Sequence, residues 1–346
     1  MSTKTLYKVV FILLGIGSLV YMVYALGIDN IWANLQQTGI WFIPVLLSWF
    51  VIYFMNALAF RDIIRENNYE GAKISFGRIL QLTISGYAIN YITPFVALGG
   101  EPYRIMSLTP ALGKAKASSS VLLYGMMHIL SHLVFWVLSI GLIIFYLPVS
   151  PTVIATCVVI IALAGGLLFW VSRISKHGIL NSVFRVATKL PFIGKAAKRL
   201  QQKNETLFTE IDMQINDLYK HRKPKFYSSL FWEFFARVIG CVEIYLIARA
   251  LGLEMNYIEA IIVSSGSSLF ANLIFFFPMQ LGTREGGMAL AMSVVGFSAS
   301  AGVFIGLATR IRELIWIVIG LLLTLLVRNK TAPLDVEENL KELSHE

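Results

Sequence analysis

Arginine and glutamate residues stand inside the apolar stretches of this 346-residue chain. Glu101 and Arg104 follow one proline–glycine segment, and Arg284 and Glu285 lie in another. One such charge at the centre of a bilayer costs about 2.5–3.5 kcal/mol on insertion scales, so these residues are expected to face protein or water and to mark a functional site. The candidate binding residues are Asn90, Glu101, Arg104, Glu233, Arg237, Asn272, Arg284, Glu285, Arg310, Arg312 and Glu313.

These residue types favour a charged ligand. The planar fork of arginine matches a phosphate group with two hydrogen bonds. A carboxylate matches an amine or carries a coupling proton, so the set suits a headgroup with both charges or a phosphate with polar hydroxyls. The alternative is that the charges pair and only fix helix packing. Glu233 and Arg237, spaced i, i+4 on one helix face, suit either interpretation.

Two histidines have the spacing of zinc ligands. His128 and His132 are also four residues apart, but the glutamate that follows the first histidine of a metalloprotease is missing. We therefore expect packing or hydrogen bonding from them, and no metal. The sequence contains neither a Walker loop nor a dinucleotide-binding turn, so we expect no cofactor.

The composition shows which elements position these residues. The chain is 57% hydrophobic and 14% charged, against about 25% charged in soluble domains. Uncharged runs cover residues 9–28, 40–60, 79–100 and 117–171. Because about 20 apolar residues make a spanning helix, we predict an all-α polytopic membrane protein.

The distribution of charge predicts the topology. Residues 173–225 hold twelve Lys/Arg and four Asp/Glu, a net +8, which places this loop in the cytoplasm and suits an amphipathic segment on an anionic leaflet. A basic loop between two spans needs no nucleic-acid partner. If residues 79–100 crossed the membrane completely, this loop would lie outside. We therefore expect that run to enter and return on the cytoplasmic side.

Two breaks resemble each other, one at 93–101 and one at 277–287. Each holds a proline, then Leu-Gly and a glutamate, and each follows a small polar stretch and an asparagine. Irregular backbone within a membrane is tolerated only against protein or water. We predict about eight membrane segments with two re-entrant hairpins from opposite sides, which form an inverted repeat around a midplane site. The expected hinge residues are Pro94, Gly99, Gly100, Pro278, Gly282 and Gly286.

The chain thus divides into four parts. Residues 1–172 form a first membrane half, 173–225 the basic loop, 226–328 a second half, and 329–346 a short charged tail. Both termini are expected in the cytoplasm, with the protein in the inner membrane.

Two stretches carry a family resemblance. Asn90 to Pro94 with Gly99 to Arg104, and Pro278 with Leu281 to Gly286, resemble the membrane region of the lysylphosphatidylglycerol synthase/flippase family. The likeness covers residues 8–327, although Met279 and Gln280 replace glycines usual in that family. It implies a flippase that moves an aminoacylated or otherwise modified lipid between leaflets. The family's aminoacyltransferase domain is missing, so we expect a separate enzyme to make the lipid.

Three functions stay open. The first is a transporter of a charged phospholipid or lipid-linked headgroup, which is not an enzyme. The second is a membrane transferase acting on a polyprenyl-phosphate or lipid-linked sugar, whose carboxylates would serve as acid and base. The third is a partner subunit for a lipid-modifying enzyme. The expected partners are membrane lipids and that separate enzyme, without nucleic acid, and a homo-oligomer is compatible with the sequence.

Overall fold

The computed structural model describes residues 27–65, 74–93, 99–148, 151–174, 194–273, 280 and 282–325, with isolated positions at 17, 20, 21, 24, 184, 187 and 188. Within these ranges the chain is helical and contains no strand, which confirms the all-α prediction. Pro94 and Pro278, residues 1–16 and the tail after residue 325 lie outside the described residues.

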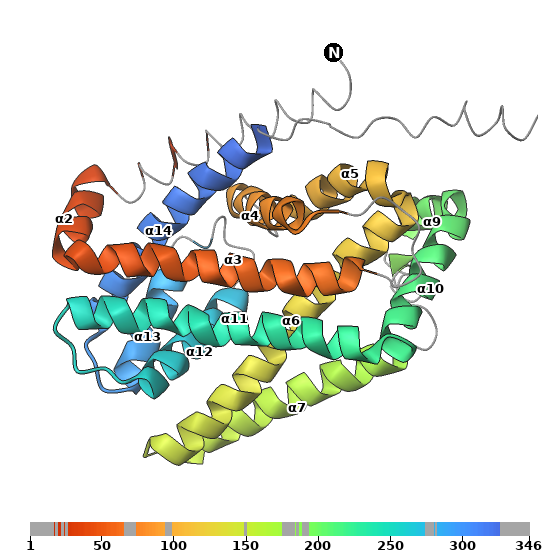
Figure 1. Cartoon of the computed structure of the whole chain (residues 1–346). Coiled ribbons are helices and arrows are strands. Elements are labelled where there is room, and N and C mark those ends of the chain that lie inside the picture. Colours follow the sequence, from red (N-terminus) through yellow and green to blue (C-terminus); the bar gives the residue numbers. More distant parts are fainter. Residues whose placement is uncertain are drawn as a thin grey trace, which may run out of the picture.

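Figure 1 shows the arrangement of the helices. Their bounds are α2 Ile28–Thr38, η1 Gly39–Trp41, α3 Phe42–Ile64, α4 Phe76–Ile92, α5 Gly100–Leu112, α6 Lys114–Tyr146, α7 Pro151–Ile174, α9 Gly194–Lys203, α10 Glu205–Lys220, α11 Lys223–Ala250, α12 Tyr257–Leu273, α13 Thr283–Val294 and α14 Ala299–Leu325.

The helices α4 and α5 form the first hairpin. Ser75 caps α4 by accepting from Arg78 N at 3.3 Å, and α4 ends where Thr93 takes the extended backbone that a following proline favours. Gly100 N donates to Asn90 Oδ1 at 2.6 Å, and Arg104 Nε donates to the Leu82 carbonyl at 3.4 Å. These contacts make α4 and α5 antiparallel, so α6 begins at the end of the molecule where α4 begins.

The second hairpin consists of α12 and α13. Ser267 Oγ lies 3.5 Å from the Arg284 carbonyl, and Phe270 packs against Gly287, so these two helices are also antiparallel. Between them Gly282 has φ +80°, a left-handed conformation suited to glycine, and Gln280 has φ +52°. The hairpin returns to the end of the molecule where α11 finishes.

The two hairpins therefore open at opposite ends of the molecule. The helix α14 starts at the open end of the second hairpin and ends at the open end of the first hairpin. There Gln81 Nε2 of α4 donates to the Leu323 carbonyl of α14 at 2.8 Å. Arg222 donates to the carbonyls of Ile63 and Arg65 at this same end. The starts of α4, α6 and α11 and the end of α3 thus lie together at one end of the molecule.

The described part of the basic loop packs closely on the helical body. In α10, Ile211, Ile215 and Leu218 are buried in a cluster with the starts of α4 and α6. Ser119 of α6 also donates to Gln214 of α10. In α9, Lys195 and Lys198 are exposed. The loop thus combines an anchored helix with an exposed basic one, and its predicted contact with a leaflet stays a prediction.

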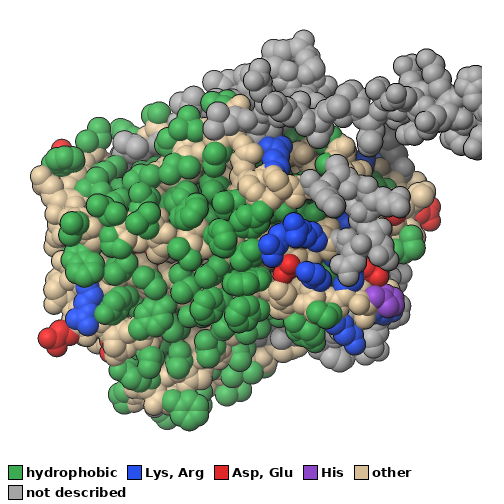
Figure 2. Space-filling view, in the orientation of Figure 1, with side chains coloured by type: hydrophobic (Ala, Val, Ile, Leu, Met, Phe, Trp, Pro, Cys, Tyr) green, Lys and Arg blue, Asp and Glu red, His purple; other side chains and the backbone are tan. Residues whose placement is uncertain are grey.

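One face of the molecule shows a broad apolar surface. In Figure 2 hydrophobic side chains cover the middle of this face, and most of the charged groups gather at one side. Two helical stretches are long and apolar enough to cross a membrane, residues 28–64 and Lys114–Tyr146, among the residues that could be searched. The antiparallel helices α3 and α11 run side by side across this apolar region (Figure 1).

Candidate functional site

The charged residues predicted from the sequence, together with Glu243, form two groups. The first ionic cluster lies between the first hairpin, α6 and α11, and the second lies between the second hairpin, α14 and α11. We define them by their charged members: Glu101, Arg104, Glu233 and Arg237 in the first, and Glu243, Arg284, Glu285, Arg310, Arg312 and Glu313 in the second.

Arg104 holds the first hairpin together. Its guanidinium bonds to the Leu82 and Thr83 carbonyls of α4 and to Glu101 Oε1 at 3.4 Å. Asn90 Nδ2 donates to the same Glu101 oxygen at 3.1 Å. The side chain of Glu101 is 25% exposed, but its Oε2 is buried and has no hydrogen-bond partner among the described groups, whereas Arg104 is buried and fully engaged with α4 and Glu101.

A chain of hydrogen bonds continues from the hairpin to α11. Tyr87 Oη lies 3.1 Å from Tyr124 Oη and 3.2 Å from His128 Nδ1. His128 Nδ1 in turn lies 2.9 Å from Glu233 Oε2. The Arg104 guanidinium sits 5.2 Å from the centres of both tyrosine rings. Glu233 is 1% exposed, and its partner in this chain is a histidine instead of an arginine.

Arg237 is held by neutral groups. Its guanidinium donates to Ser131 Oγ at 2.7 Å, to His132 Nε2 at 2.7 Å and to the His128 carbonyl at 2.8 Å. Within the described residues no carboxylate lies within salt-bridge distance of it, including Glu233 one turn earlier on the same helix. The i, i+4 spacing therefore places both groups on one face without pairing them. Arg237 remains partly exposed.

The second cluster consists of matched ion pairs. Arg284 of α13 pairs with Glu313 of α14, and Arg310 of α14 pairs with Glu285 of α13 at 2.8 Å. Arg310 Nη2 also donates to the Gln280 carbonyl at 2.6 Å. These bonds cross between α13 and α14 in both directions, so they fasten the second hairpin to the last helix.

The third pair of this cluster joins α14 to α11. Arg312 donates to both oxygens of Glu243, at 2.7 and 2.9 Å, and both side chains are buried. The Trp49 indole donates to Glu243 Oε2 at 2.9 Å, and its ring centre lies 3.5 Å from the Arg312 guanidinium carbon. The bidentate geometry is the strong form of an arginine–carboxylate pair.

Some predicted site residues lie elsewhere or act differently. The exposed Asn272 bonds to the Ser268 carbonyl of its own helix at 2.7 Å and, unlike Asn90, does not join the hairpin arms. Gly99 has an ordinary helical φ of −70°. Gly286 lies inside α13 with open space around it. Gly100 is needed for close approach, because a Cβ there would overlap the Gly86 carbonyl, and Gly282 is needed for its left-handed backbone.

Several site residues have no signal in the sequence that separates them from ordinary core residues. The tyrosines Tyr87 and Tyr124 and the tryptophan Trp49 belong to this group. His128 and His132 have a visible spacing, and the structure gives them the hydrogen-bonding role expected for them. In the described part of the chain, no three His, Cys, Asp or Glu side chains come together as metal ligands.

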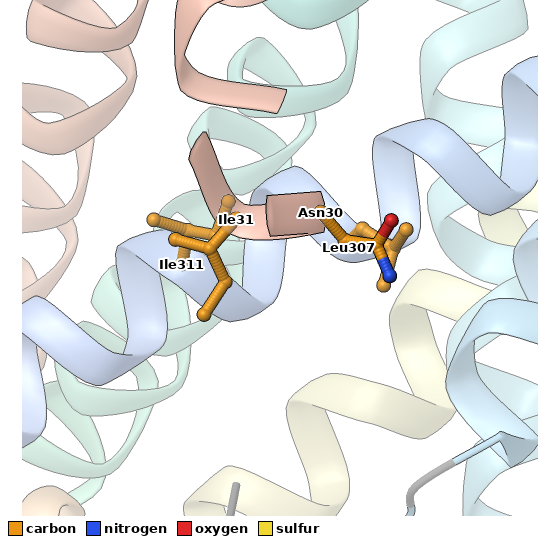
Figure 3. A pocket seen from close by; sticks show the side chains of 4 residues that line it. All are labelled: Asn30, Ile31, Leu307 and Ile311. Carbon is orange, nitrogen blue, oxygen red and sulfur yellow. The ribbon is translucent and has the colours of Figure 1, made fainter. Parts of the chain in front are cut away.

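Two hollows on α14 are apolar. A crevice lined by Asn30, Ile31, Leu307 and Ile311 leaves no room for a water molecule (Figure 3). A groove of about 670 Å³ has an almost wholly apolar lining of Val20, Tyr24, Gly27, Ile28, Leu314, Ile315 and Val318. It begins one residue after Glu313, so an apolar surface adjoins the second ionic cluster along α14.

The fold and the buried charges define a helical transmembrane protein. Residues 6–321 match the family described as the lysylphosphatidylglycerol synthase TM region, and the chain therefore belongs to this family. Comparison with curated proteins gave no match, and neither did comparison with solved structures. Membership gives the chain a lipid-related role in a membrane and confirms the resemblance found in the sequence.

Proposed function

We propose that this protein is a flippase, which moves a charged phospholipid or lipid-linked headgroup between leaflets without altering it covalently. The observation that carries this proposal is the pair of helical hairpins that open at opposite ends of the molecule and carry Arg and Glu side chains at their closed ends. Broken helices from both sides around a midplane site are the usual architecture of proteins with alternating access.

The closed ends of both hairpins meet the middle of α14. Ile92, at the end of α4, packs with Ile317, and Tyr91 lies against the same small cluster as Leu314. Arg284, at the start of α13, pairs with Glu313. The two hairpins thus approach α14 within a few residues of each other, which supports re-entrant segments that stop near the centre of the bilayer.

The pattern of helix contacts supports an inverted repeat. The contacts of α3 with α4, α4 with α5 and α5 with α6 correspond to those of α11 with α12, α12 with α13 and α13 with α14. Across the halves, α4 packs on α14 as α12 packs on α6, and α3 packs against α11. Exchange of α3–α6 for α11–α14 therefore preserves these contacts.

The first cluster supplies the chemistry for a lipid phosphate. Arg237 is partly exposed and bonds to neutral acceptors, so a phosphate can replace these without breaking an ion pair. Glu101, whose Oε2 has no hydrogen-bond partner among the described groups, suits the amine or hydroxyl of a headgroup. We place the protein in the inner membrane, with the basic end that holds Arg222 and Lys225 in the cytoplasm.

A vesicle assay tests this proposal. The protein is reconstituted into vesicles that hold a tail-labelled phosphatidylglycerol or its lysyl derivative, and a membrane-impermeant reductant measures how fast inner-leaflet label becomes accessible. Arg237→Gln is expected to slow this movement at least about tenfold, the loss that one charge-assisted bond of about 1.5–3 kcal/mol gives. The matched control is Arg249→Gln in the same helix, because Arg249 is exposed at its end. No movement in the wild-type protein would refute the proposal.

A further inference from the structure

Glu233 and His128 are joined in a way that the binding of a headgroup does not require. The carboxylate is 1% exposed, with one oxygen 2.9 Å from His128 Nδ1 and the other buried without a hydrogen-bond partner among the described groups. Charged groups within a membrane usually pair with one another, and the four other glutamates of the two clusters each pair with an arginine.

The proton of the hydrogen bond between His128 Nδ1 and Glu233 Oε2 can lie on either atom, and the same arrangement of heavy atoms suits both cases. With the proton on nitrogen, the bond joins a carboxylate to N–H; with the proton on oxygen, it joins a carboxylic acid to a neutral imidazole. Neither heavy atom has to move. The imidazole also reaches the surface, since its side chain is 34% exposed and its Nε2 makes no hydrogen bond within the described chain. The ring therefore connects a buried acid to the outside.

The surrounding groups favour exchange of one proton. His128 lies next to Tyr87 of α4 and His132 of α6. Tyr87 in turn contacts Tyr124 of α6, the Arg104 guanidinium of α5 and, at 3.2 Å, Asn56 of α3. The fixed cation on the same helix is Arg237. Without an added proton, Glu233 balances the charge of Arg237, and Glu101 balances that of Arg104. One added proton leaves this region with a net charge of +1.

A net positive charge in a medium of low dielectric constant favours the entry of an anion. We infer that Glu233 and His128 hold one exchangeable proton and take it up together with one singly charged lipid phosphate at Arg237. This inference rests on the proposed function and names its substrate class and its driving force. Proton and phosphate together carry no net charge, so the movement is driven by a pH gradient and is indifferent to membrane potential.

The test uses full-length protein in vesicles that contain tail-labelled phosphatidylglycerol. A pH gradient is imposed across the membrane, and the label in each leaflet is measured at equilibrium. One proton per lipid predicts an inner-to-outer ratio that changes about tenfold per pH unit. A potassium diffusion potential at equal pH is expected to leave the ratio unchanged. Lipid that equilibrates evenly whatever the gradient would overturn the inference and leave the proposed flippase intact.

Two variants assign the proton to its residues. Glu233→Gln has nearly the same shape but cannot ionise, and the leaflet ratio is then expected to ignore the gradient. Glu254→Gln is the matched control, since Glu254 is exposed after α11, and should behave as the wild type. An infrared readout needs no transport: on acidification the wild type should gain a protonated-carboxyl band in addition to those that its other carboxylates give, and Glu233→Gln should lack this additional band. Equal acid-induced spectra of the two proteins would overturn the assignment.

Discussion

The two ionic clusters use the same residue types in different ways. In the second, three arginines meet three glutamates, and Arg312 binds Glu243 through two bonds. In the first, Glu233 meets a histidine and Arg237 meets a serine, a histidine and a carbonyl. The matched pairs leave little for a ligand to bind. The unmatched charges can still gain from one, and from this difference we propose that the first cluster is the site and the second its support.

The largest effect should come from removal of one partner in the matched cluster. Arg312→Ala leaves the buried Glu243 charge without its counter-ion, and we expect a loss of about 3–5 kcal/mol in the free energy of unfolding. Equilibrium unfolding in detergent micelles measures it. The double variant Arg312→Met with Glu243→Leu should recover most of the loss. A loss below about 1 kcal/mol for the single variant would end the distinction between support and site.

A smaller loss is expected where the first hairpin closes on itself. A Cβ at Gly86 would overlap the Arg104 guanidinium, so Gly86→Ala must displace the residue that joins α4 to α5. Overpacking of this kind costs about 1–3 kcal/mol. Gly125→Ala, with nothing within 4 Å of the added methyl, is the control and should be neutral or slightly stabilising. Equal melting temperatures for the two variants would contradict this account.

The unmatched arginine should matter less for stability than for transport. Arg237→Gln removes bonds to neutral groups that water can satisfy, and we expect a loss of about 1–2 kcal/mol. Unfolding under the conditions used for Arg312→Ala gives the comparison. If Arg237→Gln destabilises the protein as much as Arg312→Ala does, then both clusters are structural.

The smallest expected effect on stability is the difference between the two asparagines that precede the breaks, Asn90 and Asn272. Asn90 bonds to Gly100 N and to Glu101, whereas Asn272 bonds only within its own helix. We expect Asn90→Ala to cost about 1–2 kcal/mol and Asn272→Ala less than about 0.5 kcal/mol. The same pair of thermal unfolding curves measures both, and a reversed order would show that the second break depends on its asparagine too.

Most helices could be predicted from apolar runs and helix breakers. The uncharged run over 40–60 falls within residues 39–64, which η1 and α3 cover, and the run over 79–100 begins inside α4, Phe76–Ile92. The run over 117–171 is divided between α6, Lys114–Tyr146, and α7, Pro151–Ile174, which begins at a proline. Positive charge in the loop over 173–225 led us to expect that the first hairpin is re-entrant, and this re-entry stays a prediction. These features depend on local composition, which a sequence contains directly.

The partners within the site could not be predicted in this way. His128 and Glu233 are 105 residues apart, and neither has a local pattern that selects the other. The likeness of the two breaks also suggested equal roles for Asn90 and Asn272, but one residue faces its hairpin partner and the other is exposed. Tertiary packing decides which face of a helix contacts which neighbouring helix. The spacing of residues in the sequence does not predict these contacts.

The glycines of α14 set the separation of the two hairpins. Gly306 packs closely against Glu285 of the second hairpin, and Gly320 packs closely against Ala88 of the first hairpin. Fourteen residues separate these two glycines, which is about 21 Å along a helix axis at 1.5 Å per residue. One residue inserted between them would lengthen that distance and turn one glycine about 100° away from its hairpin. Length changes in this short stretch are therefore harder to accommodate than in any surface loop of the chain.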